Sequence, residues 1–175
     1  MKVEIRNAHH NELNIVHHLI TFDLQWTQFN GPYFPYQSPS LIEFKEGVFK
    51  RLCEGVDMQL ITIDNKPVGS VSFYWECEST RWLEMGVVLY DSTYWGKGIA
   101  YKALRLWITH LFSTLEIARV GVTTWSGNKA MMSCALKVGF TQEACLRKVR
   151  YYQGQYYDSI KYGLLRDEWE TLNKI

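Results

Sequence analysis

The sequence predicts an α+β domain of strands and helices, and three observations lead to this prediction. Segments of strand length alternate with segments that carry apolar residues at helical spacing. Turn-forming residues separate these segments, as at 64–67 (Asp-Asn-Lys-Pro) and 153–155 (Gln-Gly-Gln). The length of 175 residues suits one core, so residues 1–175 are treated as a single domain.

The composition restricts the class of protein. Apolar residues make up 47% and charged residues 21%, which is typical of a globular chain. The formal net charge of +1 creates no strong field for nucleic acid or membrane partners. The N-terminal residues form no apolar signal segment, and no stretch approaches the length of a membrane span. We therefore expect a cytoplasmic protein without nucleic-acid or membrane partners.

The four cysteines are scattered through the chain and form no zinc pattern. No CxxC pair or Cys/His cluster has ligand spacing, so we expect neither a metal nor a disulfide framework. For Cys134 a buried, inert thiol is favoured over a catalytic one.

The N-terminal third contains a segment rich in aromatic residues. A strand is predicted at 2–7 and helices at 11–22 and 40–53. Between the helices, three prolines exclude a regular helix. The rings either pack against the edge of the core or form a wall of the substrate-binding site. The residues proposed for that wall are Trp26, Tyr33 and Tyr36.

The rest of the chain alternates strands and helices. Strands are predicted at 57–63, 68–76, 81–89 and 119–124, helices at 98–112 and 128–138, and a final hairpin at 141–151 and 156–166.

The loop before the helix at 98–112 is a candidate phosphate site. Gly96 and Gly98 allow the backbone to approach phosphate oxygens, and the helix start exposes unpaired amides. A Walker loop is excluded because GxxxxGK[ST] is absent. A dinucleotide-binding fingerprint is disfavoured because Tyr101 stands where Gly or Ala is required. The remaining interpretation is a coenzyme A pyrophosphate loop.

The order of these motifs resembles the GNAT family of N-acetyltransferases. The family loop [RQ]xxGx[GA] aligns with residues 95–100 (WGKGIA), and residues 122–140 resemble the family's second conserved region. The segment 156–169 (YYDSIKYGLLRDEW) resembles the Rim group, which acetylates N-termini of ribosomal proteins. The resemblance covers residues 55–170.

The resemblance implies the GNAT fold, an α+β fold in αβα layers. It consists of a mixed twisted sheet of about six or seven strands with about four helices, and the sheet is splayed between the strands at 81–89 and 119–124. Acetyl-CoA enters there as co-substrate. Its pantetheine arm pairs with the strand backbone and its pyrophosphate binds the loop amides. The implied acetyl-CoA contacts are Val87, Val88, Leu89, Trp95, Gly96, Lys97, Gly98, Ile99, Ala100, Tyr101 and Asn128.

The chain departs from the family pattern at two positions. Trp95 stands where the family has Arg or Gln, which backbone phosphate binding tolerates. Ala135 stands where many members carry the Tyr or Ser that acts as general acid, so any proton donor must come from elsewhere.

Two polar residues have both a structural and a functional interpretation. Glu84 lies between apolar residues of a predicted strand. It forms an ion pair there or acts as the general base through water, the role of a matching Glu in relatives. Asn128 is a helix N-cap, and it also contacts acetyl-CoA or the acceptor if the resemblance holds.

These features predict an acetyl-CoA-dependent N-acyltransferase. The acceptor is a primary amine, either a small molecule or a protein N-terminus. A non-catalytic module that binds or senses acetyl-CoA is the alternative, because of Ala135. A homodimer is compatible with the sequence, which leaves the oligomeric state and the acceptor open.

Overall fold

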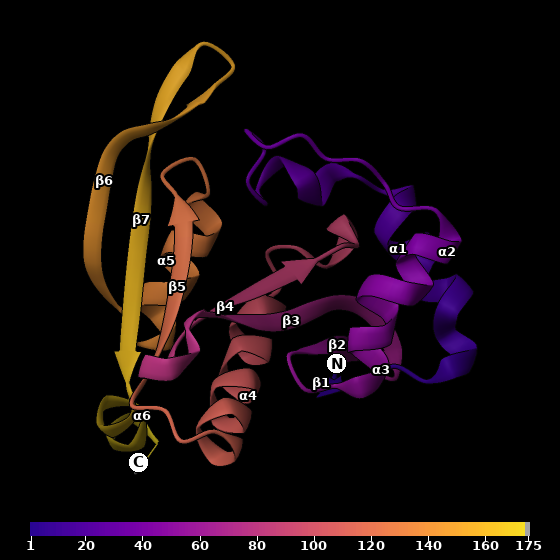
Figure 1. Cartoon of the computed structure of the whole chain (residues 1–175), viewed down its shortest axis with the longest axis horizontal. Helices are drawn as coiled ribbons and strands as arrows, with labels where there is room; N and C mark the ends of the chain where they lie inside the picture. The colour runs from indigo at the N-terminus through magenta and orange to yellow at the C-terminus, as the bar shows by residue number, and fades with distance from the viewer. Residues whose placement is uncertain (174–175) are drawn as a thin grey trace. The chain divides into compact units, whose positions relative to one another are not determined.

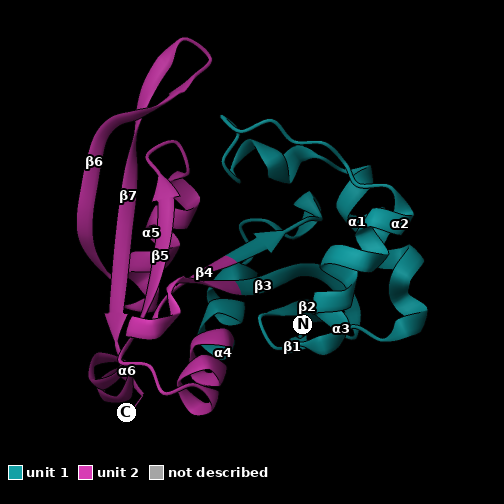
Figure 2. Cartoon of the chain, viewed as in Figure 1, with its two compact units in different colours: residues 1–72, 87–106 teal, residues 73–86, 107–175 magenta. Residues whose placement is uncertain are grey.

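The computed structural model describes residues 1–173 and packs into two compact units (Figure 2). Unit 1 contains residues 1–72 and 87–106, and unit 2 contains residues 73–86 and 107–173. Strands β3 (Lys66–Cys77) and β4 (Trp82–Leu89) and helix α4 (Ile99–Thr114) contribute residues to both units. The chain therefore crosses between the units inside regular elements rather than through linkers.

The strands form a mixed sheet, as the sequence predicts. Hydrogen bonds connect seven strands in the order β1-β2-β3-β4-β5-β7-β6. β4 runs parallel to β5 (Arg119–Trp125), and Glu84 lies opposite Gly121 in their register. β5 is antiparallel to β7 (Gln155–Leu165), which is antiparallel to β6 (Thr141–Tyr152). With the helices, this arrangement is the predicted α+β fold.

Unit 1 holds an antiparallel part of the sheet. β1 (Val3–Arg6) pairs with β2 (Met58–Ile63), and β2 pairs with β3. All six residues of β2 are buried, so this strand lies at the centre of a core. Helix α1 (Leu13–Phe22) contributes Val16 and Ile20 to that core.

The predicted helix at 40–53 forms, with an irregular middle. It consists of α2 (Leu41–Phe44), one π-helical turn (Lys45–Phe49) and α3 (Lys50–Glu54). Ser40 caps its start: the Ser40 Oγ accepts from the Glu43 amide at 3.3 Å, and the Glu43 carboxylate accepts from the Ser40 amide at 2.8 Å. Gly55 ends it in the left-handed conformation, which glycine adopts without a steric penalty.

Unit 2 contains strands β5, β7 and β6, which lie side by side in Figure 1, and helix α5 (Lys129–Val138). Residues Gln153 and Gly154, with φ of 48° and 76°, form the tight turn of the β6–β7 hairpin. The predicted hairpin, strands and helices are thus present, with ends shifted by a few residues.

The hairpin is the last element predicted from the sequence, but the chain continues into a further helix, α6 (Arg166–Leu172). Arg166 explains its position. Its guanidinium donates to the carbonyl oxygens of Phe112, Leu115 and Ile117 at 2.6, 2.8 and 2.9 Å, at the end of α4 and just beyond it. The last carbonyls of a helix lack partners within it, and this arginine donates to such groups. The Leu115 carbonyl also accepts from the Ile117 amide at 3.0 Å. A seven-residue helix held by such contacts carries little periodicity to detect.

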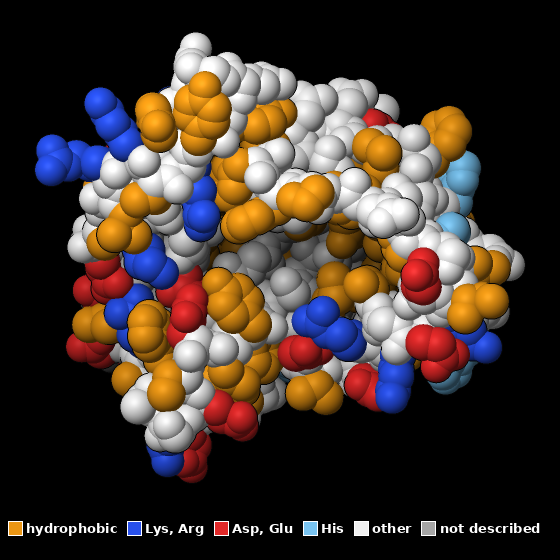
Figure 3. Space-filling model, turned by 45° about the horizontal axis from the view of Figure 1, so that its top comes forward, with side chains coloured by type: hydrophobic (Ala, Val, Ile, Leu, Met, Phe, Trp, Pro, Cys, Tyr) orange, Lys and Arg blue, Asp and Glu red, His pale blue; other side chains and the backbone are white. Residues whose placement is uncertain are grey.

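Charges of both signs are interspersed on the face shown in Figure 3, in agreement with the net charge of +1. None of the helices within residues 1–173 has the length and apolarity to cross a membrane.

Candidate active site

The loop predicted to bind phosphate contains two glycines in the left-handed backbone region. Gly96 and Gly98 have φ of +71° and +74°, a region that side-chain-bearing residues rarely adopt. Apart from the glycine itself and its two chain neighbours, no heavy atom lies within 4 Å of the position a β-carbon would take at either residue. α4 begins at Ile99, directly after the loop, so unpaired amides of the first helical turn follow the open glycines. The space beside both glycines is therefore open, as the predicted phosphate site requires.

Trp95 anchors this loop to the end of β4. Its indole Nε1 donates to the Leu89 carbonyl oxygen at 3.0 Å, and its ring packs edge-on against Phe29 at 5.5 Å. The tryptophan therefore has a structural function at the position where the family carries Arg or Gln.

Basic side chains lie near the loop. The ammonium groups of Lys66 and Lys97 each lie 5.6 Å from the centre of the Tyr94 ring. Arg105, one turn beyond Tyr101 on α4, lies 5.9 Å from the Tyr101 ring centre. Lys66 is paired with the Asp91 carboxylate at 3.8 Å. Lys97, within the loop, adds positive charge to that of the helix start, which favours phosphate groups.

β4, the strand before the loop, lies close to β3 at Gly69. A β-carbon on Gly69 of β3 would collide with the backbone oxygen of Val88, so this glycine permits β3 and β4 to approach. Val87, Val88 and Leu89 are all half-buried. The predicted pantetheine segment is thus ordered strand rather than loop.

Glu84 is a buried carboxylate, with 2% of its surface exposed. Its Oε2 accepts a hydrogen bond from Thr123 Oγ1 at 2.8 Å. Its Oε1 lies over Gly121, 2.5 Å from where a β-carbon on that glycine would be. No ion pair within residues 1–173 includes Glu84, so the direct ion pair considered from the sequence is absent.

Asn128 is the N-cap of α5, as predicted. Its Oδ1 accepts from the Met131 amide at 3.0 Å. Ala135, at the position of the usual proton donor, is fully buried. Burial raises the pKa of the neighbouring Cys134 thiol, which disfavours the reactive thiolate.

The phenol of Tyr74 interacts electrostatically with Glu84 and was not predicted from the sequence. Burial and then the charge of Glu84 raise the pKa of Tyr74 to about 12, so this hydroxyl keeps its proton at neutral pH. Tyr74 lies on β3, which is the neighbour of β4, the strand that contains Glu84. No sequence motif includes Tyr74.

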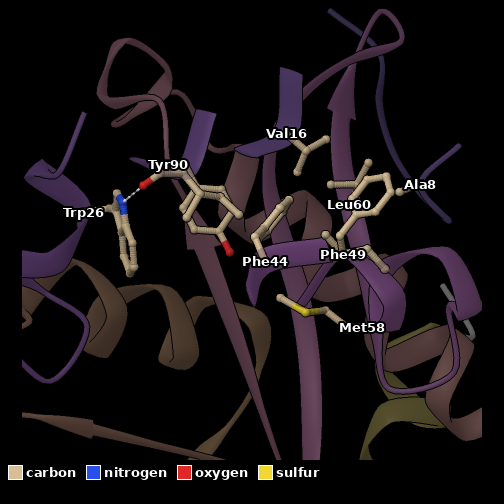
Figure 4. Packing of buried hydrophobic residues seen from close by; sticks show 10 residues of the cluster. Ala8, Val16, Trp26, Phe44, Phe49, Met58, Leu60 and Tyr90 are labelled. Atoms are coloured by element: carbon tan, nitrogen blue, oxygen red, sulfur yellow. Dashed lines mark hydrogen bonds between the residues drawn. The ribbon is translucent and has the colours of Figure 1, made fainter. Parts of the chain in front are cut away.

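The aromatic segment is divided between core and surface. Trp26 is 7% exposed, and its indole donates to the Ile20 carbonyl oxygen at 3.2 Å. Its ring packs edge-on against Tyr90 at 5.2 Å (Figure 4). It also packs edge-on against Tyr36 at 5.0 Å. Tyr36 is 41% exposed and Tyr33 is half-buried. Trp26 is therefore part of the core, whereas Tyr33 and Tyr36 have accessible surface.

The predicted residues fall into two groups. Unit 1 contains the aromatic segment, the end of β4 and the loop from Trp95 to Tyr101, and unit 2 contains Glu84 and Asn128. An open cavity of about 1040 Å³ in unit 2, lined by Arg81, Phe112, Arg166 and Glu170 among others, includes none of them. Within residues 1–173 no group of three or more His, Cys, Asp or Glu side chains could hold a metal ion.

Comparison with known families is decisive for the class of protein. A model described as "Acetyltransferase (GNAT) domain" matches residues 4–141. The chain belongs to the GNAT acetyltransferase family. The GNAT match includes Glu84, the glycine loop and Asn128, and ends at the first residue of β6.

Two GNAT relatives come from Bacillus subtilis (strain 168). The putative ribosomal N-acetyltransferase YdaF is 31% identical over 116 residues, which cover 66% of this chain and 62% of that protein. The uncharacterized N-acetyltransferase YokL of the SPbeta prophage is 30% identical over 107 residues, covering 61% and 60%. The chain thus spans less than two thirds of the length of the curated relatives it matches.

Solved GNAT structures match over nearly the whole chain. RimL, a ribosomal L7/L12 α-N-protein acetyltransferase in complex with coenzyme A, has a TM-score of 0.77 at 25% identity, covering 96% of both chains. The Salmonella typhimurium acetyltransferase that modifies the N-terminal serine of L7/L12 has a TM-score of 0.73 at 25% identity, covering 94% of this chain and 95% of its own. The GNAT fold is confirmed, and so is the predicted resemblance to the Rim group.

Proposed function

We propose that residues 1–175 form one acetyltransferase domain that transfers the acetyl group of acetyl-CoA to a primary amine. The open glycine loop at Gly96 and Gly98 carries this proposal, because its positive φ angles and empty surroundings fit a pyrophosphate. The resemblance to RimL in complex with coenzyme A supports the same ligand.

In the proposed reaction a neutral amine attacks the thioester carbonyl carbon directly. A C–N bond forms, the C–S bond breaks, and the electron pair leaves with sulfur. Glu84 takes the amine proton through a water molecule, which suits a buried carboxylate without a direct cation partner. Positioning of the two substrates supplies much of the remaining acceleration.

The acceptor that fits best is a protein N-terminus. An α-amine has a pKa of about 7.7–8.0 and a lysine amine about 10.4, so the α-amine is far more often neutral near pH 7. The two RimL-type proteins, which modify an α-amine, support this class.

The test measures thiol release from acetyl-CoA with matched acceptors. Peptides with a free N-terminus and no lysine should react, whereas the same peptides with a blocked N-terminus and one lysine should react at least about tenfold more slowly. Spermidine and amino acids complete the set. Faster turnover with spermidine would replace the α-amine by a polyamine amine, and faster turnover with free amino acids would replace the protein N-terminus by a small-molecule α-amine.

The alternative, a non-catalytic acetyl-CoA sensor, is favoured by Ala135 alone. It predicts calorimetric binding of acetyl-CoA without thiol release for any amine. That combination of results would overturn transferase activity and keep the ligand.

A further inference from the structure

Three polar side chains from neighbouring strands of unit 2 form one hydrogen-bonded chain. Thr123 of β5 donates to Glu84 Oε2 at 2.8 Å, and Lys161 Nζ of β7 donates to Thr123 Oγ1 at 3.2 Å. Thr123 and Lys161 lie directly opposite each other in the β5–β7 register. Glu84 lies opposite Gly121, two residues before Thr123 on the same face of β5.

The direction of these hydrogen bonds follows from the groups. An ammonium can only donate, so Lys161 takes a lone pair of the Thr123 oxygen. The single hydroxyl proton of Thr123 then points to Glu84, because an ionised carboxylate only accepts. Each bond polarises the next in the same sense. Oε2 of Glu84 is held in place, and Oε1, over Gly121, is the oxygen left to take a proton.

A second carboxylate of unit 2 lies over a glycine in the same way but has a direct cation partner. Glu143 of β6 lies over Gly163, as Glu84 lies over Gly121, and Gly163 is opposite Gly121 in register. Glu143, however, accepts directly from the Arg119 guanidinium at 2.7 Å. A direct cation opposes proton uptake by a carboxylate. Glu84 has a hydroxyl between itself and the cation, so it is oriented without a direct ion pair.

We propose that Thr123 is the positioning residue for Glu84, and that Lys161 orients the Thr123 hydroxyl. The inference rests on the proposed function, in which Glu84 Oε1 accepts the amine proton while nitrogen attacks the thioester. Without the Thr123 hydroxyl the carboxylate remains buried but rotates away from one productive orientation. The proton transfer then slows, whereas acetyl-CoA binding is unaffected.

The experiment compares Thr123→Val with Thr123→Ser. Valine keeps the shape and strand preference and removes the hydroxyl, whereas serine keeps the hydroxyl. Thr123→Val should lower kcat about 10- to 100-fold, the worth of a hydrogen bond to a charged group. Its KM for acetyl-CoA should stay near wild type, whereas its Tm should fall by a few degrees because the buried carboxylate loses a hydrogen bond. Thr123→Ser should retain kcat within about threefold. Lys161→Met should lower kcat by less than Thr123→Val does.

A double-mutant cycle tests whether Thr123 acts through Glu84. In a Glu84→Gln background, Thr123→Val should cause no further loss of kcat. Three results would each overturn the inference: losses of kcat in Thr123→Val and Glu84→Gln that add fully, a Thr123→Ser variant with the low kcat of Thr123→Val, or an unchanged kcat in Thr123→Val. In each case, turnover by the wild-type protein leaves the proposed function intact. Absence of wild-type turnover with every amine overturns both, and calorimetry with acetyl-CoA shows whether the ligand survives.

Discussion

Glu84 Oε1 occupies the space that a β-carbon on Gly121 would need: the two positions are 2.5 Å apart across the parallel β4–β5 pair. Gly121 is buried and has no positive φ, so it is retained here for its lack of a side chain rather than for its backbone freedom. The glycine thus determines where the buried carboxylate can lie.

Gly121→Ala should therefore displace the Glu84 carboxylate. We expect kcat to fall about 10²-fold, within the range that general-base assistance contributes, with little change in acetyl-CoA affinity. Steady-state kinetics and calorimetry on the same preparation measure both.

The control is Gly163→Ala, directly opposite in the β5–β7 register, where the new β-carbon meets Glu143 instead. That variant should lose stability and keep kcat. Equal loss of kcat in both variants would mean that general distortion of the sheet, not Glu84, explains the effect.

Gly98→Val should weaken acetyl-CoA binding at least tenfold, because a branched side chain fills the open space before α4 and opposes a φ of +74°. Calorimetry measures the Kd. Gly154→Val provides a matched control, since Gly154 has a φ of +76° and equally open surroundings in the β6–β7 turn. If both variants bind acetyl-CoA alike, the phosphate loop is assigned incorrectly.

Trp26→Ala and Tyr33→Ala should differ. Trp26 is buried against Tyr90 and Tyr36, so its truncation should cost about 3–5 kcal/mol of unfolding free energy and harm both substrates. Tyr33→Ala should raise KM for the amine, because the ring is proposed to form part of the acceptor pocket, and should leave KM for acetyl-CoA nearly unchanged. Its Tm should change little because Tyr33 is only half-buried. A drop in Tm with equal harm to both substrates would make Tyr33 a core residue. Tyr36→Ala serves as the third member of this set.

Asn128→Ala should lower the unfolding free energy by about 1 kcal/mol through loss of the α5 cap. Asn128→Ser should keep the cap. Chemical denaturation measures the stability, and calorimetry measures acetyl-CoA affinity. A serine variant that is stable but binds acetyl-CoA weakly would establish the predicted contact, and unchanged affinity in both variants would restrict Asn128 to capping.

The elements and the glycine loop were predictable because they depend on local interactions. A run such as 95–100 (WGKGIA) before an amphipathic segment specifies a turn and a helix start within one stretch of chain. α6 was missed because Arg166 reaches carbonyls 49 to 54 residues away in sequence, which no local pattern records.

Glu84 was singled out correctly as an unusual polar residue in a strand, yet its surroundings were not predictable. Thr123 is 39 residues away in sequence, and Lys161 a further 38. Their only signal is polar residues at positions that share one sheet face, and this signal has a meaning only once strand order and register are known.

The sequence by itself determined the order of strands and helices up to the final hairpin, the glycine loop before α4, the N-cap at Asn128 and membership of the GNAT family. Local backbone preferences and short motifs encode all of these. The tertiary structure alone decided that Glu84 lies over Gly121, that Thr123 separates it from Lys161, and that Trp26 is in the core. These relationships arise from register between distant strands and from packing, where a shift of one residue would turn every side chain to the other face.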